Sequence, residues 1–285
     1  MERRRLANAK ISCFADEIDP SVDRQLELLH RLGIKWIEFR SGDGRNVADY
    51  TEKEALLLKE KLEAAGIGIS ALGSPIGKIE ITQDFEPHFQ KFKGLAQLAD
   101  IWETGSIRMF SFYVPEGEAD IWRDEVMRRT QRMVDYAAQK NLLLLHENEK
   151  GIYGDTAPRC LELMREFYGE NFRCTFDFAN FVQCRQDTME AYEMLKPYIS
   201  YVHVKDALWE TGEVVPAGQG DGQLAAIFEK LDNSGYQGFL SLEPHLADFA
   251  GLKMLEKDAK ERKCTDGEAA FCMAYDALEK LIHLS

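Results

Sequence analysis

Residues 22–40 read VDRQLELLHRLGIKWIEFR and contain the repeating unit from which the fold is predicted. Apolar side chains at Val22, Leu26 and Leu29 recur every three or four positions, which is typical of a helix with one buried face. Gly33 follows and suits the left-handed residue that ends many helices. The apolar run after it is typical of a strand. The segment is therefore predicted to be a helix joined to a strand by a very short loop.

The same helix–glycine–strand junction recurs further along the chain. Gly66, Gly105 and Gly235 each follow a helical pattern and precede an apolar segment. Eight strands are predicted, near residues 9–14, 34–40, 67–72, 106–113, 141–147, 172–177, 199–205 and 238–243. Helical patterns lie between and after them, at about 20–32, 52–65, 84–100, 119–139, 156–167, 187–196, 223–234 and 267–283.

Eight alternating strand–helix units without a strand-only region predict a parallel sheet. This number of units favours one (β/α)8 TIM barrel, an α/β fold, over residues 1–285. A doubly wound open sheet is the alternative, but no GxGxxG motif follows the first strand. A charged segment at about 246–266 is expected to be an insert before the last helix.

Composition narrows the classes of function. The chain has 285 residues with 35 Lys+Arg against 49 Asp+Glu, a formal net charge of −14, which argues against nucleic-acid binding. The longest aliphatic run, residues 142–145, is far too short to span a membrane. The six cysteines form no CxxC pair and no signal-peptide core follows the basic N-terminus, so we expect free thiols and a cytoplasmic protein.

Metal-binding residue types stand at the ends of the last four predicted strands. LLLLHE reaches Glu147, CTFD reaches Asp177, YVHVKD carries His203 and FLSLE ends at Glu243. Strand alternation allows all four side chains to point into the barrel at its carboxyl end. Three neighbouring buried carboxylates repel each other unless a cation compensates them. Three oxygen ligands and one nitrogen suit Mn²⁺, Mg²⁺ or Co²⁺, and Zn²⁺ is also compatible. The alternative is that the acids cap helices or pair with Lys and Arg.

Several motifs resemble those of the xylose-isomerase-like superfamily, and more narrowly its sugar phosphate isomerase/epimerase branch, which includes ketose 3-epimerases. The motifs, in order, are HENEKGIYGDT (146–156), FDFANF (176–181), VHVKDA (202–207), PAGQGDG (216–222) and SLEPH (241–245). ISCFADEI (11–18) and GSPIGK (73–78) also fit a bacterial subgroup, so the resemblance covers nearly the whole chain.

The resemblance implies that Glu147, Asp177, His203 and Glu243 ligate one divalent metal ion. It further implies that the two glutamates transfer protons on opposite faces of the substrate. Many relatives have His where this chain has Asn180, and an amide cannot act as a general base. The resemblance also suggests a homodimer or homotetramer, with a small carbohydrate as the substrate.

The expected function is that of a metal-dependent isomerase or epimerase of a small sugar or sugar phosphate. Such an enzyme removes a proton beside a carbonyl and forms a metal-stabilised enediolate. The alternative is a dehydratase (lyase) of a keto-inositol or keto-sugar, using the same metal. A non-catalytic sugar-binding protein is less favoured because binding needs no pair of proton-transfer carboxylates. An apurinic-site endonuclease is disfavoured by the few histidines near strand ends and by the net charge.

Other polar side chains near the predicted strand ends are candidates for binding the substrate. They are Asn180, Lys205, His245, Arg40, Ser111 and Lys78. Arg40 and Lys205 have an ion pair as the alternative role, and Lys78 a simple turn. The GxGxG sequence at residues 218–222 suits either a phosphate site or a tight turn into the next helix.

Overall fold

The computed structural model describes residues 5–247 and 266–283 of the chain. The predicted charged insert at 246–266 therefore lies almost wholly outside the described residues.

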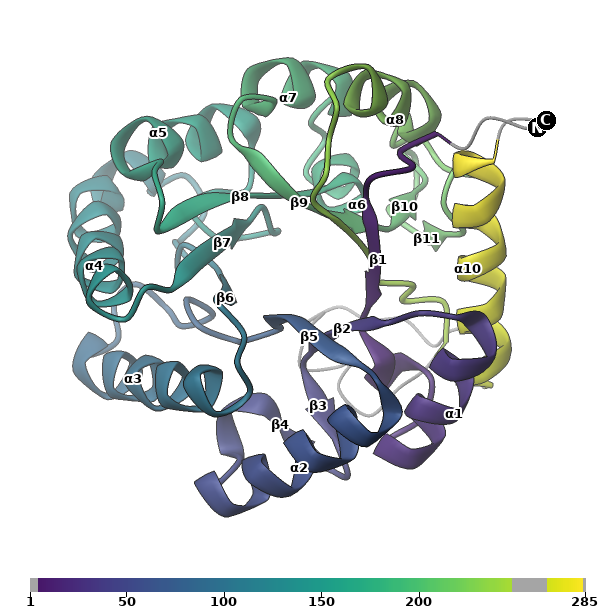
Figure 1. The fold of residues 1–285 in the computed structure, drawn as a ribbon. Helices are drawn as coiled ribbons and strands as arrows, with labels where there is room; N and C mark the ends of the chain where they lie inside the picture. Colours follow the sequence, from purple (N-terminus) through teal and green to yellow (C-terminus); the bar gives the residue numbers. More distant parts are fainter. Residues whose placement is uncertain (1–4, 248–265, 284–285) are drawn as a thin grey trace.

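Eight parallel strands form a single sheet that curls into a barrel (Figure 1). Along the sheet the order is β1-β12-β9-β8-β7-β6-β5-β2, and β1 packs beside β2, which brings the two edges together. The strands are β1 (Lys10–Cys13), β2 (Trp36–Phe39), β5 (Gly68–Leu72), β6 (Ser106–Met109), β7 (Leu143–Glu147), β8 (Phe172–Asp177), β9 (Ile199–Val204) and β12 (Phe239–Leu242). The predicted TIM barrel is confirmed, and each of the eight predicted strands corresponds to one of these.

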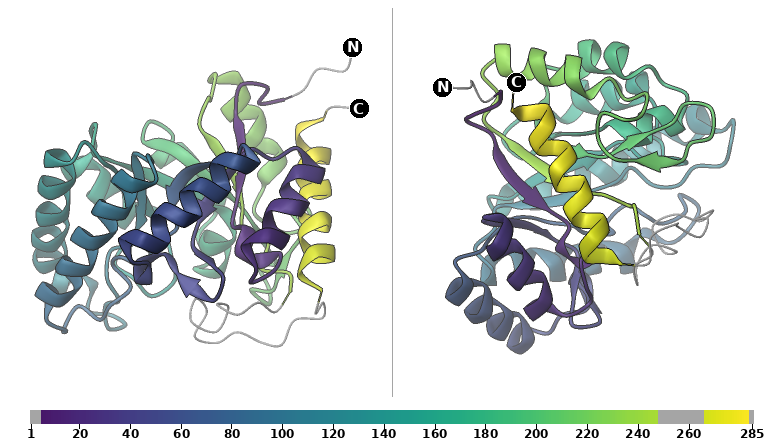
Figure 2. Two further views of the ribbon diagram at one scale, coloured as in Figure 1. Left: turned by 60° about the horizontal axis from the view of Figure 1, so that its bottom comes forward. Right: turned by 90° about the vertical axis from the view of Figure 1, so that its right-hand side faces the viewer.

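Helices surround the barrel as an outer ring (Figures 1 and 2). The principal helices are α1 (Val22–Leu32), α2 (Glu52–Ala65), α3 (Phe85–Ile101), α4 (Ala119–Gln139), α5 (Ala157–Phe167), α7 (Thr188–Leu195), α8 (Leu224–Asn233) and α10 (Gly267–Ile282). All eight predicted helices are present within a few residues. None of the helices in the described ranges is long and apolar enough to cross a membrane.

Local signals in the sequence account for where several helices begin and end. Gly33 and Gly66 end α1 and α2 in the left-handed conformation, with φ of 71° and 68°. Thr51 and Glu54 form the reciprocal capping box that starts α2. Because these ends are set locally, the chain passes from each helix into the following strand within a few residues.

The apolar interior has two layers. The larger cluster lies between the strands and the helices and includes Ile37, Phe39, Leu144 and Phe176. A small cluster of Ala71, Leu145 and Tyr201, with Leu143 and Phe239 against it, fills the inside of the barrel. The five cysteines in the described ranges are free thiols.

Short elements lie in the segments that follow several strands at their carboxyl ends. They are the 3₁₀ helices η1 (Ala15–Glu17) and η2 (Val47–Asp49), the hairpin strands β3 (Ser41–Gly42), β4 (Arg45–Asn46), β10 (Asp206–Ala207) and β11 (Val214–Val215), and the helix α6 (Phe178–Gln183). These elements build the end of the barrel at which the polar side chains gather.

Candidate metal centre and its surroundings

Four acid and imidazole side chains come together at the carboxyl ends of β7, β8, β9 and β12. One ligand atom from each of Glu147, Asp177, His203 and Glu243 lies within 4.8 Å of those of the other three. All four residues are buried, with exposed fractions of 0–3%. β12, β9, β8 and β7 are consecutive in the sheet, so the four side chains occupy one half of the barrel.

The alternation of side chains along the strands explains this convergence. Leu145 lies two residues before Glu147, and Tyr201 lies two residues before His203. Both belong to the apolar cluster inside the barrel. Side chains two positions apart point to the same face of a strand. Leu145 and Tyr201 therefore lie inside the barrel directly below the acid and imidazole groups.

His203 lies at the centre of the group. Its Nδ1 is 3.0 Å from Glu147 Oε1, 3.5 Å from Glu243 Oε2 and 3.8 Å from Asp177 Oδ2. Its Nε2 points the other way and is 3.0 Å from Glu38 Oε2 on β2. One ring nitrogen thus faces the three other candidate ligands and the other faces a buried carboxylate.

Two buried cations lie against the carboxylates. Lys205 Nζ is 3.0 Å from Asp177 Oδ2 and 2.9 Å from Glu243 Oε2. Arg108 Nη1 is 3.1 Å from Glu147 Oε2 and 3.7 Å from Glu243 Oε1. These ion pairs offset part of the repulsion between carboxylates that are removed from water.

The pKa values of the carboxyl groups separate according to their neighbours. Burial opposes the ionisation of Glu147, but His203 and Arg108 outweigh it and lower its pKa to about 2. Burial dominates at Asp177 and raises its pKa to about 7, against the attraction of Lys205. For Glu243, Lys205 and His245 overcome burial and hold the pKa well below its usual value. Carboxyl groups with different proton affinities within one site are typical of acid–base chemistry.

The donor set fits a divalent metal ion. Within the described ranges, Glu147 Oε2 and Asp177 Oδ2 are buried and accept no hydrogen bond, although each has a cation nearby. Three carboxylates and one imidazole supply oxygen and nitrogen donors suited to Mn²⁺, Mg²⁺, Co²⁺ or Zn²⁺. Glu147, Asp177, Glu243 and the Nδ1 of His203 are the groups that would hold the ion.

Asn180, His245 and Arg40 lie around the candidate ligands. Asn180 Nδ2 donates to Glu147 Oε1 at 3.3 Å and to the carbonyl of Asn148 at 2.9 Å. His245 Nε2 lies 3.4 Å from Glu243 Oε1. Arg40 Nη1 donates to Glu243 Oε1 at 3.2 Å. Together with Lys205, these are the predicted substrate-binding residues that the fold brings to the carboxylates.

Arg40 also has strong structural partners. Its guanidinium donates to Asp16 at 2.9 and 3.1 Å and to Glu17 at 3.1 Å. Its carbon Cζ lies 4.3 Å from the centre of the Phe14 ring. The residue thus holds η1 against β2 and contacts Glu243, which is the predicted ion-pair role, while its role in binding substrate stays a prediction.

Ser111 and Lys78 make their contacts with the loops beside the site. Ser111 Oγ accepts from the backbone N–H of Gly154 at 2.8 Å, and therefore supports the loop after β7. Lys78 Nζ donates to Glu149 Oε2 at 2.8 Å and lies 4.3 Å from the centre of the Phe110 ring. In this arrangement both residues stabilise loops next to the site.

Glu38 and Arg108 were not among the residues expected from the sequence. Both lie within strands, have 1% and 2% exposed surface, and point into the barrel beneath the candidate ligands. The available signal was a charged residue inside the apolar segments IKWIEFR and SIRMFSFY. A buried charge at such a position needs a partner inside the barrel.

The GxGxG sequence after β9 wraps around the carboxylate of Asp206. The backbone N–H groups of Gly218, Gly220 and Gly222 donate to Asp206 at 2.9 Å, and so does that of Ala207. A Cβ on Gly220 or Gly222 would lie 2.5 or 2.7 Å from Asp206 Oδ1. The structure therefore shows a tight turn here, with these N–H groups already bonded.

Replacing Asp206 by Asn is expected to destabilise the fold by about 2–4 kcal/mol. The amide nitrogen cannot accept, so at least one pair of backbone N–H groups would lose its partner in a buried position. Urea unfolding would measure the change in the free energy of unfolding. Asp221→Asn is the matched control: Asp221 lies in the same loop and accepts from the backbone N–H of Trp209, but it is exposed, so water can replace that bond. An equal loss in both variants would contradict the role of Asp206.

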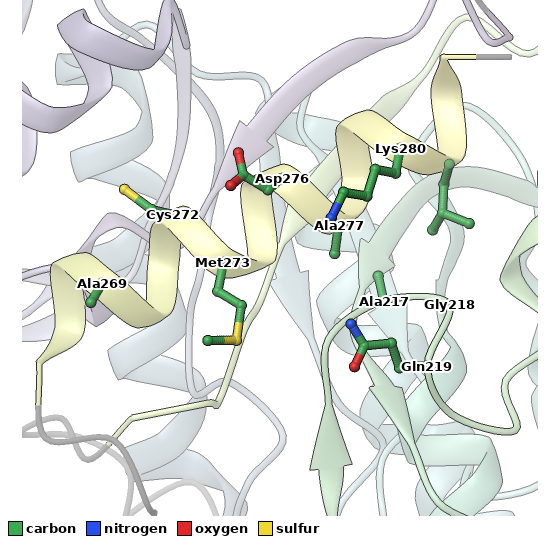
Figure 3. A pocket seen from close by; sticks show the side chains of 10 residues that line it. Ala217, Gly218, Gln219, Ala269, Cys272, Met273, Asp276, Ala277 and Lys280 are labelled. Carbon is green, nitrogen blue, oxygen red and sulfur yellow. The ribbon is translucent and has the colours of Figure 1, made fainter. Parts of the chain in front are cut away.

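A surface pocket of about 650 Å³ lies apart from the four candidate metal ligands (Figure 3). It is formed between α10 and the segment 217–219, and its lining includes Met273, Asp276 and Lys280. None of the four candidate ligands lines it.

A profile described as xylose isomerase-like TIM barrel matches residues 26–262. The chain belongs to this family. In sequence it is 28% identical to the 3-dehydroshikimate dehydratase of Bacillus anthracis over 251 residues, which is 83% of this chain and 86% of that protein.

Solved structures of ketose 3-epimerases share the fold. The structure of L-ribulose 3-epimerase superposes with a TM-score of 0.75 at 18% identity, covering 96% of this chain and 94% of that one. D-psicose 3-epimerase from Clostridium cellulolyticum H10, solved with D-tagatose, gives a TM-score of 0.74 at 13% identity, covering 95% and 98%. Enzymes of two reaction types thus share this barrel fold.

Proposed function

We propose that this protein is a divalent-metal-dependent enzyme that removes a proton from the carbon beside the carbonyl of a small polyhydroxylated ketone. The observation that carries the proposal is the buried group of Glu147, Asp177, His203 and Glu243, whose ligand atoms lie within 4.8 Å of one another. A bound metal ion would supply Lewis acidity toward the substrate's carbonyl and hydroxyl oxygens.

Glu147 and Glu243 are the proposed proton-transfer groups. β8 and β9 separate their strands in the sheet, so the two carboxylates reach the site from different strands. One takes the proton and the other returns a proton from the opposite side, which inverts the carbon in an epimerase. Return of the proton to the neighbouring carbon gives aldose–ketose isomerisation. Asn180 and Lys205 are proposed to orient substrate oxygens.

Dehydration is the second candidate function. It is favoured by the sequence match to 3-dehydroshikimate dehydratase, which extends over 83% of this chain. The first step is the same proton removal, but a hydroxyl on the next carbon then leaves as water. Lys205, which contacts both Asp177 and Glu243, is the side chain proposed to give a proton to that hydroxyl.

Exchange of substrate hydrogen in D₂O tests the shared step and separates the candidates. Metal-stripped protein is reloaded with Mn²⁺, Mg²⁺, Co²⁺ or Zn²⁺ and mixed with ketoses, ketose phosphates, keto-inositols and 3-dehydroshikimate. We expect metal-dependent incorporation of deuterium at the carbon beside the carbonyl. NMR and mass spectrometry would detect it. An epimer or aldose identifies the first function, and an unsaturated product the second. If metal-stripped protein exchanged hydrogen at the same rate, metal dependence would be contradicted. If none of these ketones exchanged hydrogen, the proposed substrate class would be contradicted.

A further inference from the structure

We infer that Glu38 is a positioning residue that holds the imidazole of His203 with Nδ1 toward the metal ion. The inference rests on the proposed metal-dependent function. Glu38 lies on β2, on the opposite side of His203 from the other three candidate ligands.

The hydrogen bonds of His203 define the two sides of its ring. Nε2 lies 3.0 Å from Glu38 Oε2, and Nδ1 lies 3.0 Å from Glu147 Oε1. A carboxylate can only accept, so a neutral His203 that bonds to Glu38 carries its proton on Nε2. Nδ1 then presents its lone pair toward Glu147, Asp177 and Glu243. A carboxylate behind a metal-binding histidine fixes both the tautomer and the ring orientation.

Glu38 is itself held by other strands of the barrel. Ser241 Oγ donates to Glu38 Oε2 at 2.9 Å from β12. Arg108 Nε lies 3.8 Å from Glu38 Oε1, from β6. The β2–β5 pairing shifts register between Ile37 and Glu38, next to the point where this carboxylate enters the barrel. Contacts from β6, β9 and β12 thus converge on one oxygen pair that has no surface exposure.

The cost of burying Glu38 supports a role for its charge. An isolated carboxylate in this position would be strongly unfavourable. Arg108 compensates several carboxylates at once, and its nearest approach is to Glu147 rather than to Glu38. The shortest contacts of Glu38 are those to His203 and Ser241. The imidazole of His203 is therefore the main ionisable partner of the Glu38 carboxylate.

Metal titration of a Glu38→Gln variant tests the inference without a substrate. We expect the Mn²⁺ and Co²⁺ affinities, measured by calorimetry on folded metal-free protein, to fall 10- to 100-fold. Ser241→Ala is expected to give a smaller decrease, because it removes one support of Glu38 and leaves the charge. Ser12→Ala is the control, since Ser12 lies inside the same barrel and bonds to Ser70 instead. Wild-type affinity in a folded Glu38→Gln variant would overturn the inference.

Nitrogen NMR of the wild-type protein loaded with Zn²⁺ provides a test that does not depend on a variant folding. We expect His203 to carry its proton on Nε2 and to bind the ion through Nδ1. The opposite assignment would overturn the positioning role of Glu38. Failure of wild-type protein to bind any of the ions would instead refute the proposed metal-dependent function, so the two failures are distinguishable.

Discussion

Replacing Glu147 or Glu243 by Gln is expected to lower kcat by about 10³- to 10⁴-fold, because each carboxylate has two proposed roles. It would hold the metal ion, and it would accept or return a proton. Gln keeps the volume of the side chain but cannot take up a proton. Loss of a positioned acid–base group costs about 10²- to 10⁴-fold. A 10³-fold loss corresponds to about 4 kcal/mol of transition-state stabilisation.

The two glutamates are expected to respond differently in metal binding. Both glutamates lie near His203 and Arg108, but Glu243 also has Lys205, Arg40 and His245 near it, whereas Glu147 accepts from Asn180. Glu147→Gln and Glu243→Gln therefore each leave a different set of cationic side chains without a carboxylate partner. Measurement of kcat together with metal affinity separates loss of the proton-transfer group from loss of the ion.

Glu166→Gln is a matched control for these variants, because Glu166 is an exposed residue of α5 with the same chemical change. It should retain wild-type turnover. Turnover near the wild-type level in Glu147→Gln or Glu243→Gln, at saturating metal, would refute the two-carboxylate mechanism.

Removal of the metal ion with a chelator is expected to abolish turnover and to lower Tm by about 5–10 °C. Glu147, Asp177 and Glu243 are at most 3% exposed, so their mutual repulsion is poorly screened without the ion. An ion present at 100 times its Kd stabilises the folded state by about 2.7 kcal/mol. For a chain of this size, each kcal/mol changes Tm by about 2–4 °C.

Thermal unfolding with and without added Mn²⁺ measures this effect. Adding the ion back should restore both Tm and turnover. An Asp177→Asn variant should show a much smaller rise in Tm, because one of the four donors has lost its charge. The same Tm and the same turnover before and after complete chelation would contradict a metal centre.

The elements of the barrel could be predicted from sequence because their signals are local. A glycine that ends a helix, a capping box and the alternation of apolar residues each act within a few positions. The four candidate ligands could also be proposed together, because parallel strands place their carboxyl ends at one end of the barrel. A pattern at the ends of four successive strands therefore already contains spatial information.

Contacts across the barrel could not be predicted in this way. Glu38 and His203 are 165 positions apart, and Glu38 and Ser241 are 203 apart. The strands that carry these residues meet only when the sheet closes, and the register between them depends on the packing of the whole barrel. The role of Arg108 could not be predicted for the same reason, because its partners Glu38, Glu147 and Glu243 come from three other strands.

Patterns in the sequence were enough to predict the order of strands and helices along the chain, the family resemblance and the set of candidate ligands. The folded barrel was needed to show that Asp206 occupies the glycine turn and that Ser111 supports a loop. It was also needed to show that Glu38 lies behind His203. The physical reason is that helix ends and strand alternation depend on neighbouring residues, whereas the partner of a buried charge depends on which distant segments the closed barrel brings within hydrogen-bond distance.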